Sequence, residues 1–447
     1  MASRGVREWV GASVPVRLAS LTSMEAKPAA GSVEEGVDPV RTLWLLSAGH
    51  AVNHAQAALL PLVYIAIIAE FGVSVASIAF LAAAGSFLSG MVQLAYSGIT
   101  RYVSRRSILS VGSLVFGGGM AAQALAPGFV PFAVANIVSR LGGSPQHPVG
   151  NALLAEQFPT HRRGFAISAH IAGGNLGTVA VPLVGAWLIN EVMGWRLTVV
   201  LFGAPAILIG FAMWVLIRES GADRAAARAE GSVRQAFGRI LRDRDLLLVY
   251  LSAMLGGGGR GLGVLNIFVP LYLALVVGLD ALTVSLMYTV LVIGSVPGPI
   301  IAGWLSDRYG RRPLIVLAYL AGAASLAAFV LAGSNVPALW LAIVLMSIFN
   351  FVESPQLQAL LADLAPRGIR DASFSVYFTL AFGVGSLWVA VYGAVIDTFG
   401  EAQGLPITFW LMAAAFVAAA MAVLPIRVEE RVSAQRADDE ASGAGRS

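Results

Sequence analysis

The sequence predicts an all-α membrane protein in which twelve transmembrane helices form two six-helix bundles. Three observations predict this fold class. Apolar residues make up 57% of the 447-residue chain and charged residues only 12%, with a mean hydropathy of +0.77, which exceeds what a soluble core can bury. Apolar runs of about 20 residues, each long enough to cross roughly 30 Å of hydrocarbon, recur about twelve times. The two halves of the chain also repeat one another.

The apolar runs set the order of the elements. The predicted spans are 42–70, 74–98, 107–126, 129–155, 164–190, 195–218, 246–278, 281–302, 313–333, 337–363, 372–398 and 404–426. The runs lack the strict alternation of a transmembrane barrel. The predicted regions are a disordered cytoplasmic tail (1–41), an N-terminal bundle (42–218), a cytoplasmic linker (219–245), a C-terminal bundle (246–426) and a second cytoplasmic tail (427–447). Met1 and Met24 are both candidate start residues.

Arginine placement predicts the topology. The net charge is +4, and the arginines gather in one alternate set of loops, whereas the opposite loops carry little beyond Arg196. Cytoplasmic loops are the arginine-rich ones, so we expect a multi-pass protein of the cell (inner) membrane with both termini cytoplasmic. Arginines confined to membrane loops argue against nucleic acid as a partner. The chain has no cysteine, which excludes disulfides and thiolate chemistry.

An internal repeat indicates that the two bundles are related. Residues 152–156, Ala-Leu-Leu-Ala-Glu, recur at 359–363 as Ala-Leu-Leu-Ala-Asp, each followed by a proline and an arginine at the same spacing. Arg105 and Arg106, after the second span, correspond to Arg311 and Arg312 after the eighth. Parallel repeats of this kind place a substrate site between the halves near the middle of the bilayer.

The loop at 303–312, Gly-Trp-Leu-Ser-Asp-Arg-Tyr-Gly-Arg-Arg, closely resembles the signature loop of major facilitator transporters. The resemblance implies the major facilitator fold and alternating access, and it implies a gating network. The residues that we expect to gate the conformational change are Gly303, Asp307, Arg308, Gly310, Arg311 and Arg312. The first-half counterpart, 97–106, has lost the aspartate, so Asp307 alone is expected to anchor such a network. Alternatively, the arginines of both loops only satisfy the positive-inside rule.

Four of the five histidines fall within the predicted spans. His50, His54, His147 and His170 all fall there, and His50 and His54 share one helix face. Histidine titrates near physiological pH, so we predict proton coupling at these residues. They could instead serve only as hydrogen-bonding groups between helices. A metal site is a further alternative; with no cysteine or nearby carboxylate to complete it, we expect no metal and no cofactor.

Three other ionisable residues are expected near the middle of the membrane. Arg140 and Arg260 stay protonated, so each needs a carboxylate or an anionic substrate. Glu353 is the one carboxylate predicted well inside the hydrocarbon, and an Arg260–Glu353 pair would make Glu353 a proton site. Without such a pair, Arg260 would bind an acidic substrate.

A narrower resemblance lies mostly in the first half. Gly49–His54, Gln146–Pro148 and Gly173–Gly177 are similar to the corresponding stretches of fosmidomycin-resistance-type efflux proteins, with His54 at a position that is acidic in that family. The resemblance implies a proton-coupled secondary active transporter that exports a small organic molecule. The alternatives are a symporter that imports an organic anion such as a carboxylate, and a transporter-like receptor. No nucleophile, metal cluster or cofactor loop suggests an enzyme. The expected partners are a small-molecule substrate, protons and the lipid bilayer, and we expect a monomer.

Overall fold

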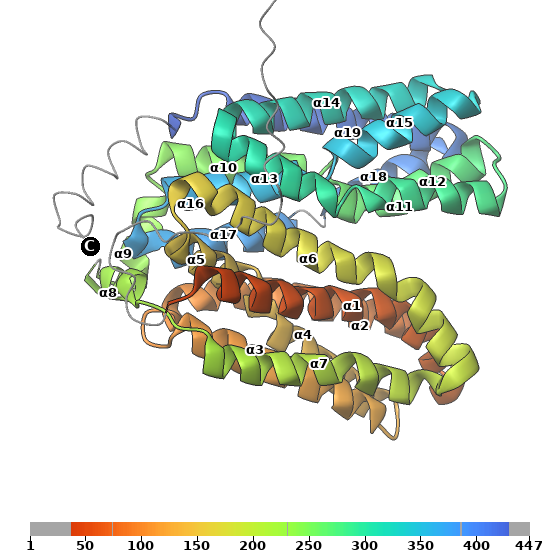
Figure 1. The fold of residues 1–447 in the computed structure, drawn as a ribbon. Helices are drawn as coiled ribbons and strands as arrows, with labels where there is room; N and C mark the ends of the chain where they lie inside the picture. Colours follow the sequence, from red (N-terminus) through yellow and green to blue (C-terminus); the bar gives the residue numbers. More distant parts are fainter. Residues whose placement is uncertain (1–36, 74, 230, 385–386, 429–447) are drawn as a thin grey trace, which may run out of the picture.

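The computed structural model describes residues 37–73, 75–229, 231–384 and 387–428, and helices occupy most of these ranges (Figure 1). The predicted tails at 1–41 and 427–447 fall almost wholly outside the described residues. Helix α1 begins just after Asp38, whose side chain accepts a hydrogen bond from the Arg41 amide, and it ends at Gly72 in the left-handed conformation.

The first half of the chain forms six long helical segments, one of which is interrupted. They are α1 (Pro39–Phe71), α2 (Val75–Ile99), α3 (Arg105–Ala124), α4 (Phe129–Gly143) with η1 (Ser144–Gln146) and α5 (Pro148–Gln157), α6 (Thr160–Trp187) with η2 (Leu188–Val192), and α7 (Gly194–Leu216). The break between α4 and α5 falls at Pro145 and Pro148, because proline has no N–H for the helical ladder.

The linker contains two short helices, α8 (Ala222–Ala229) and α9 (Val233–Ile240). The second half then forms α10 (Arg244–Gly256), η3 (Gly261–Leu265), α11 (Asn266–Leu271), η4 (Tyr272–Val276), α12 (Ala281–Ile293), α13 (Pro297–Tyr309), α14 (Arg311–Leu331), α15 (Val336–Phe349), α16 (Glu353–Leu364), η5 (Arg367–Ile369), α17 (Arg370–Phe378), η6 (Thr379–Val384), α18 (Leu387–Phe399) and α19 (Glu401–Val423). Three predicted spans of this half, 246–278, 281–302 and 337–363, are therefore interrupted within the described residues.

Breaks in membrane helices are tolerated where neighbouring protein satisfies the freed backbone groups. At the break after α10, the Gly261 amide donates to the carbonyl of Asn350, 2.7 Å away in the break between α15 and α16. The Asn350 side chain donates in turn to the Gly259 carbonyl at 3.3 Å. The two interrupted segments thus support each other, and Arg260 and Glu353 lie at these breaks.

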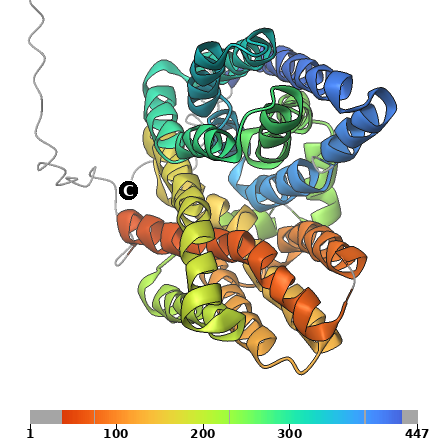
Figure 2. The same ribbon diagram turned by 90° about the vertical axis from the view of Figure 1, so that its right-hand side faces the viewer.

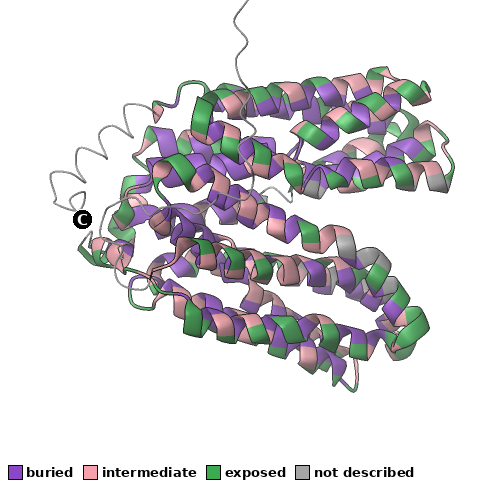
Figure 3. Cartoon of the chain, viewed as in Figure 1, coloured by how far each residue is buried: buried purple, intermediate pink, exposed green. Residues whose placement is uncertain are grey.

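The outward surface of the helices is apolar, as expected where lipid surrounds them. On α7, Leu208, Phe211 and Val215 are all more than half exposed, and Figure 3 shows exposed residues along the outer sides of both bundles. By length and composition, seven helical segments within the described ranges can span a membrane. The predicted fold class, an all-α membrane protein of two helical bundles, is confirmed.

The two bundles meet mainly at one end. Helices α1–α7 form one bundle and α10–α19 the other, with α8 and α9 against one end, which we call the linker end (Figures 1 and 2). A shared apolar core joins first-bundle residues near that end, including Leu153 and Ile217, to Leu357 and Leu361 of α16. Residues farther along the first bundle, such as Phe132, form a separate core.

Candidate functional site

The predicted gating loop closes the linker end. Asp307, near the end of α13, accepts hydrogen bonds from the backbone amides of Gly164 (3.0 Å) and Phe165 (2.8 Å) in α6 of the other bundle. Arg311 forms an ion pair with Asp307 and donates through Nη2 to the Thr160 carbonyl at 2.8 Å. Bonds from neutral donors to a carboxylate are charge-assisted and strong, so this loop fastens the bundles together.

A second carboxylate extends the network. Asp363 of α16 accepts from Arg311 Nε at 2.9 Å and from Arg163 Nη1 at 2.8 Å. Gly164 has no room for a side chain, because a Cβ there would collide with Arg311 and with Asp307 Oδ1. Gly303 approaches the same helix closely: its Cβ would lie 2.7 Å from the Gly164 carbonyl oxygen. Gly310 adopts φ +96°, which only glycine takes readily.

Two predicted members of the gating network lie outside it. The Arg308 guanidinium stacks over the Trp304 ring at 5.3 Å. Arg312 donates to the carbonyl of Ile426 at 3.2 Å. Neither arginine contacts Asp307 among the described residues, because both side chains point in other directions. Their role in gating the conformational change stays a prediction. The sequence motif places these arginines in the loop but does not determine where their side chains point.

The first-half loop, although it lacks the aspartate, holds a charge network of its own. Arg105 donates from Nε and Nη2 to both oxygens of Asp371, each at 2.8 Å, and pairs with Glu156. Asp223 of the linker accepts from Arg105 at 3.0 Å and from Arg370 at 2.7 Å. The prediction that Asp307 alone anchors a network is wrong, because Asp371 of the second bundle supplies the missing carboxylate.

Burial of Asp223 by itself raises the pKa of its carboxyl group, but the charges of Arg370 and then Arg105 outweigh burial, so the pKa lies below its usual value. This carboxylate is therefore ionised throughout the physiological range. The internal repeat relates the two networks, since Arg105 corresponds to Arg311 and Glu156 to Asp363.

Arg260 and Glu353 form the predicted pair. Arg260 Nε donates to Glu353 Oε1 at 2.9 Å, and Nη2 reaches the Ala253 carbonyl at 3.4 Å. Glu353 is fully buried, and its second oxygen, Oε2, has no hydrogen-bond partner in the part of the chain that the structure describes. A buried carboxylate with one unpartnered oxygen is suited to accept a proton, because protonation removes a buried charge.

Within the described part of the chain, the side chain of Arg140 has neutral hydrogen-bond partners. Its Nε donates to Asn136 Oδ1 at 3.0 Å, Nη1 to Ser86 Oγ at 3.3 Å and Nη2 to Tyr64 Oη at 3.2 Å. These residues come from α4, α2 and α1. Among the described residues no carboxylate lies within 4.0 Å of Arg140, and Ser86 is exposed. The guanidinium is thus held in a fixed position with its charge not neutralised.

The four predicted intramembrane histidines form one cluster. The His50 ring lies 4.4 Å from His54, 4.5 Å from His147 and 4.4 Å from His170, measured between ring centroids. The cluster also reaches the second bundle, because His147 stacks near Phe378 and Phe382 at 5.1 and 5.2 Å. The spacing along α1 predicts that His50 and His54 lie together. That His147 and His170, from two other segments, join them could be found only in the structure.

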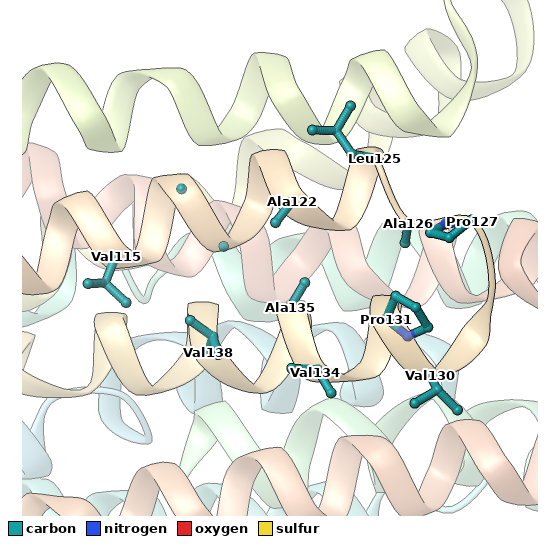
Figure 4. Close-up of a pocket in the computed structure, with 12 residues that line it drawn as sticks. Val115, Ala122, Leu125, Ala126, Pro127, Val130, Pro131, Val134, Ala135 and Val138 are labelled. Atoms are coloured by element: carbon teal, nitrogen blue, oxygen red, sulfur yellow. The ribbon is translucent and has the colours of Figure 1, made fainter.

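An apolar groove of about 760 Å³ lies between α3 and α4 (Figure 4). Its lining includes Val115 and Ala122 of α3 and Val130, Val134 and Val138 of α4, and every lining residue is apolar. A charged substrate would lose its hydration there without gaining a polar partner. The groove is therefore unsuited to an ionic substrate.

Comparisons with known proteins agree on one family. A model described as Major Facilitator Superfamily matches residues 46–388 and 259–444. The chain is 26% identical over 309 residues to a probable 4-methylmuconolactone transporter of Cupriavidus pinatubonensis, covering 65% of this chain and 68% of the relative. It is 26% identical over 383 residues to a gallate transporter of Pseudomonas putida, with coverages of 77% and 83%. A solved proton:xylose symporter superposes with a TM-score of 0.70 at 16% identity, covering 89% of this chain and 98% of that one.

Proposed function

This chain belongs to the Major Facilitator Superfamily, and we propose that it is a proton-coupled symporter that imports a small organic anion bearing a carboxylate. The family and the fold are those of transporters, so the chain is not an enzyme. Its apolar helices and its relatives are those of an integral, multi-pass membrane protein. In the proposal, the linker end faces the cytoplasm, in keeping with the arginine-rich loops.

The observation that carries the proposal is the environment of Arg140. Its guanidinium is bound by Asn136, Ser86 and Tyr64, none of which carries a negative charge. A cation inside the membrane is costly unless a counter-charge is present, and a carboxylate can bind a guanidinium through two parallel hydrogen bonds. The relatives named for 4-methylmuconolactone and gallate, both small organic acids, support this substrate class.

Arg260 and Glu353 supply the proposed coupling. While Glu353 is ionised, its charge occupies Arg260. A proton on Oε2 would neutralise Glu353 and release Arg260 to bind the substrate anion. The anion and the proton then favour each other's binding, which is the linkage that symport requires. The networks of Asp307 and Arg105 close the linker end until both are bound.

Export remains a second candidate. The histidine stretches of the first half resemble those of fosmidomycin-resistance-type efflux proteins, and that resemblance favours proton-driven removal of a small compound. The two functions differ in a simple readout, since import enriches cells in the labelled substrate and export depletes them.

A matched ligand pair tests the proposal. Binding of gallate and of methyl gallate, which lacks the carboxylate, is compared by isothermal titration with the purified protein. We expect a marked preference for gallate that Arg140→Gln abolishes and that Arg162→Gln, at an exposed arginine, preserves. Labelled gallate should then accumulate in cells that express the protein. Equal binding of the acid and the ester, or an unchanged preference in Arg140→Gln, would contradict the proposal.

A further inference from the structure

We propose that His50, His54 and His147 form a binding site for a divalent d-block metal ion such as Zn²⁺, Co²⁺ or Ni²⁺. The proposal is independent of the transport function. Each of these histidines offers one ring nitrogen, and the three nitrogens all lie within 4.8 Å of one another. Two come from α1, and the third lies between η1 and α5, so that two segments of the first bundle contribute ligands.

The hydrogen bond of His50 fixes which nitrogen is free. Its Nδ1 lies 3.0 Å from the carbonyl oxygen of His170. A carbonyl oxygen can only accept, so Nδ1 carries the proton of the neutral ring and Nε2 keeps its lone pair. Nε2 is buried and has no hydrogen-bond partner in the described part of the chain, and His50 is fully buried. The lone pair of Nε2 is thus available to bind a metal ion.

The other two histidines each also offer a ring nitrogen. His54 Nδ1 lies 3.2 Å from the hydroxyl oxygen of Thr178, which leaves Nε2 available when Nδ1 is protonated. His147 Nδ1 is buried without a hydrogen-bond partner among the described residues. Metal-binding histidines almost always donate the other ring N–H to a carbonyl or another oxygen, which orients the ring. The His170 carbonyl and Thr178 occupy these outer positions here.

The ligand set indicates the class of metal. Imidazole nitrogen suits Zn²⁺, Ni²⁺ and Cu²⁺, whereas Mg²⁺ and Ca²⁺ prefer oxygen. Zinc binds histidine nitrogen at about 2.0–2.1 Å, so two ligand nitrogens of a tetrahedral ion lie roughly 3.4 Å apart. The rings must therefore move closer together on binding. Three protein nitrogens leave a fourth position of a tetrahedral ion for water.

From the sequence we expect no metal, because no cysteine or nearby carboxylate accompanies the histidines. The structure changes that argument by bringing His147 to the His50–His54 pair, since three histidines are sufficient ligands for zinc. The absence of cysteine from the chain also helps the test, because no thiolate can contribute to the ligand field observed.

Cobalt spectroscopy and zinc calorimetry test the site on the purified full-length protein, prepared without a histidine tag. We expect one Co²⁺ per chain with the visible bands of four-coordinate nitrogen and oxygen ligation, displaced by Zn²⁺. His50→Gln, which keeps a donor for the His170 carbonyl, and His147→Gln should abolish the bands. His161→Gln, at the exposed loop histidine, is the matched control and should bind as the wild type does.

Thr178→Val keeps all three ligands and removes only the outer oxygen. Loss of such a partner weakens metal binding by about 10–100-fold, and this variant decides the matter if a histidine variant does not fold. The proposal is overturned if binding is not saturable at one ion per chain, or if Zn²⁺ affinity is unchanged in folded His50→Gln, His147→Gln and Thr178→Val proteins. Because the readout is binding, failure here leaves the proposed transport function untouched.

Discussion

Asp371 of α17 holds Arg105 of α3 with both carboxylate oxygens, at 2.8 Å from Nε and 2.8 Å from Nη2. The two residues belong to opposite bundles. At the equivalent place in the other half of the repeat, the carboxylate lies on the loop, as Asp307, and Gly164 of α6 stands where α17 has Asp371. In the two halves of the repeat, the carboxylate therefore lies on opposite sides of the interface between the bundles. Both contacts join the bundles at the linker end.

Asp371→Asn should shift the protein toward a state that is open at the linker end. Removing one partner of a buried ion pair typically costs about 3–5 kcal/mol, and this pair exists only while the bundles are closed there. Spin labels at cysteines introduced at exposed Tyr102 and Tyr309 report the opening, since the chain has no other cysteine. The distance distribution should broaden toward longer values, and Asp397→Asn, at an exposed carboxylate, should leave it unchanged. Identical distributions in both variants would contradict the role of Asp371.

Gly164→Ala should weaken the same closure by a steric route. The added methyl group would occupy the space of Arg311 and of Asp307 Oδ1, so the loop must move away from α6. The same pair of spin labels measures the effect. Gly118→Ala is the matched control, because its Cβ would meet no atom within 4 Å. A Gly164→Ala protein as closed as the control would show that the loop does not need this contact.

Glu353→Gln should separate transport from the proton gradient. Glutamine preserves the volume and a hydrogen-bond acceptor but cannot exchange a proton, so Arg260 loses its counter-charge permanently. Exchange of labelled for unlabelled gallate across liposomes should continue, whereas accumulation driven by a pH gradient should stop. A gradient of one pH unit is worth about 1.4 kcal/mol, or about tenfold accumulation for one proton per anion. Retention of that accumulation by Glu353→Gln would place the proton site elsewhere.

Asp223 of the linker should stay ionised across the physiological pH range. The pKa of Asp223 is depressed in the folded protein by Arg370 and Arg105, against the effect of burial. A depressed carboxyl pKa contributes stability that is fully present above the unfolded value of 3.8 and is lost as the pH falls through the folded value. Asp223→Asn should therefore change the spin-label distances at the linker end of the substrate-free protein equally at pH 8 and pH 5. A smaller effect of the substitution at pH 5 would mean that this carboxylate titrates there.

The sequence predicts the architecture well because membrane spans depend on composition and length, which can be read directly from the chain. The Arg260–Glu353 pair was also predictable, since the cost of a buried charge limits the possible partners to the few ionisable residues within the spans. The partners of Arg105 were not predicted, because Glu156, Asp223 and Asp371 are distant along the chain. Their meeting depends on how the bundles and the linker pack.

The histidine cluster shows the same limit. Helical spacing places His50 and His54 on one face, but nothing in the sequence indicates that His147 and His170 approach that face. The orientation of Arg308 and Arg312 could not be predicted either, because rotamer choice at a helix end depends on neighbours such as Trp304 and the end of α19.

Simultaneous recording of labelled gallate uptake and internal pH in proteoliposomes tests the central claim most directly. With no gradient imposed at the start, external gallate should enter and acidify the lumen in proportion to its uptake, and Arg140→Gln should abolish both signals. Gallate entry without acidification would contradict proton symport. A pH response to cationic or neutral compounds but not to gallate would contradict the organic-anion substrate itself.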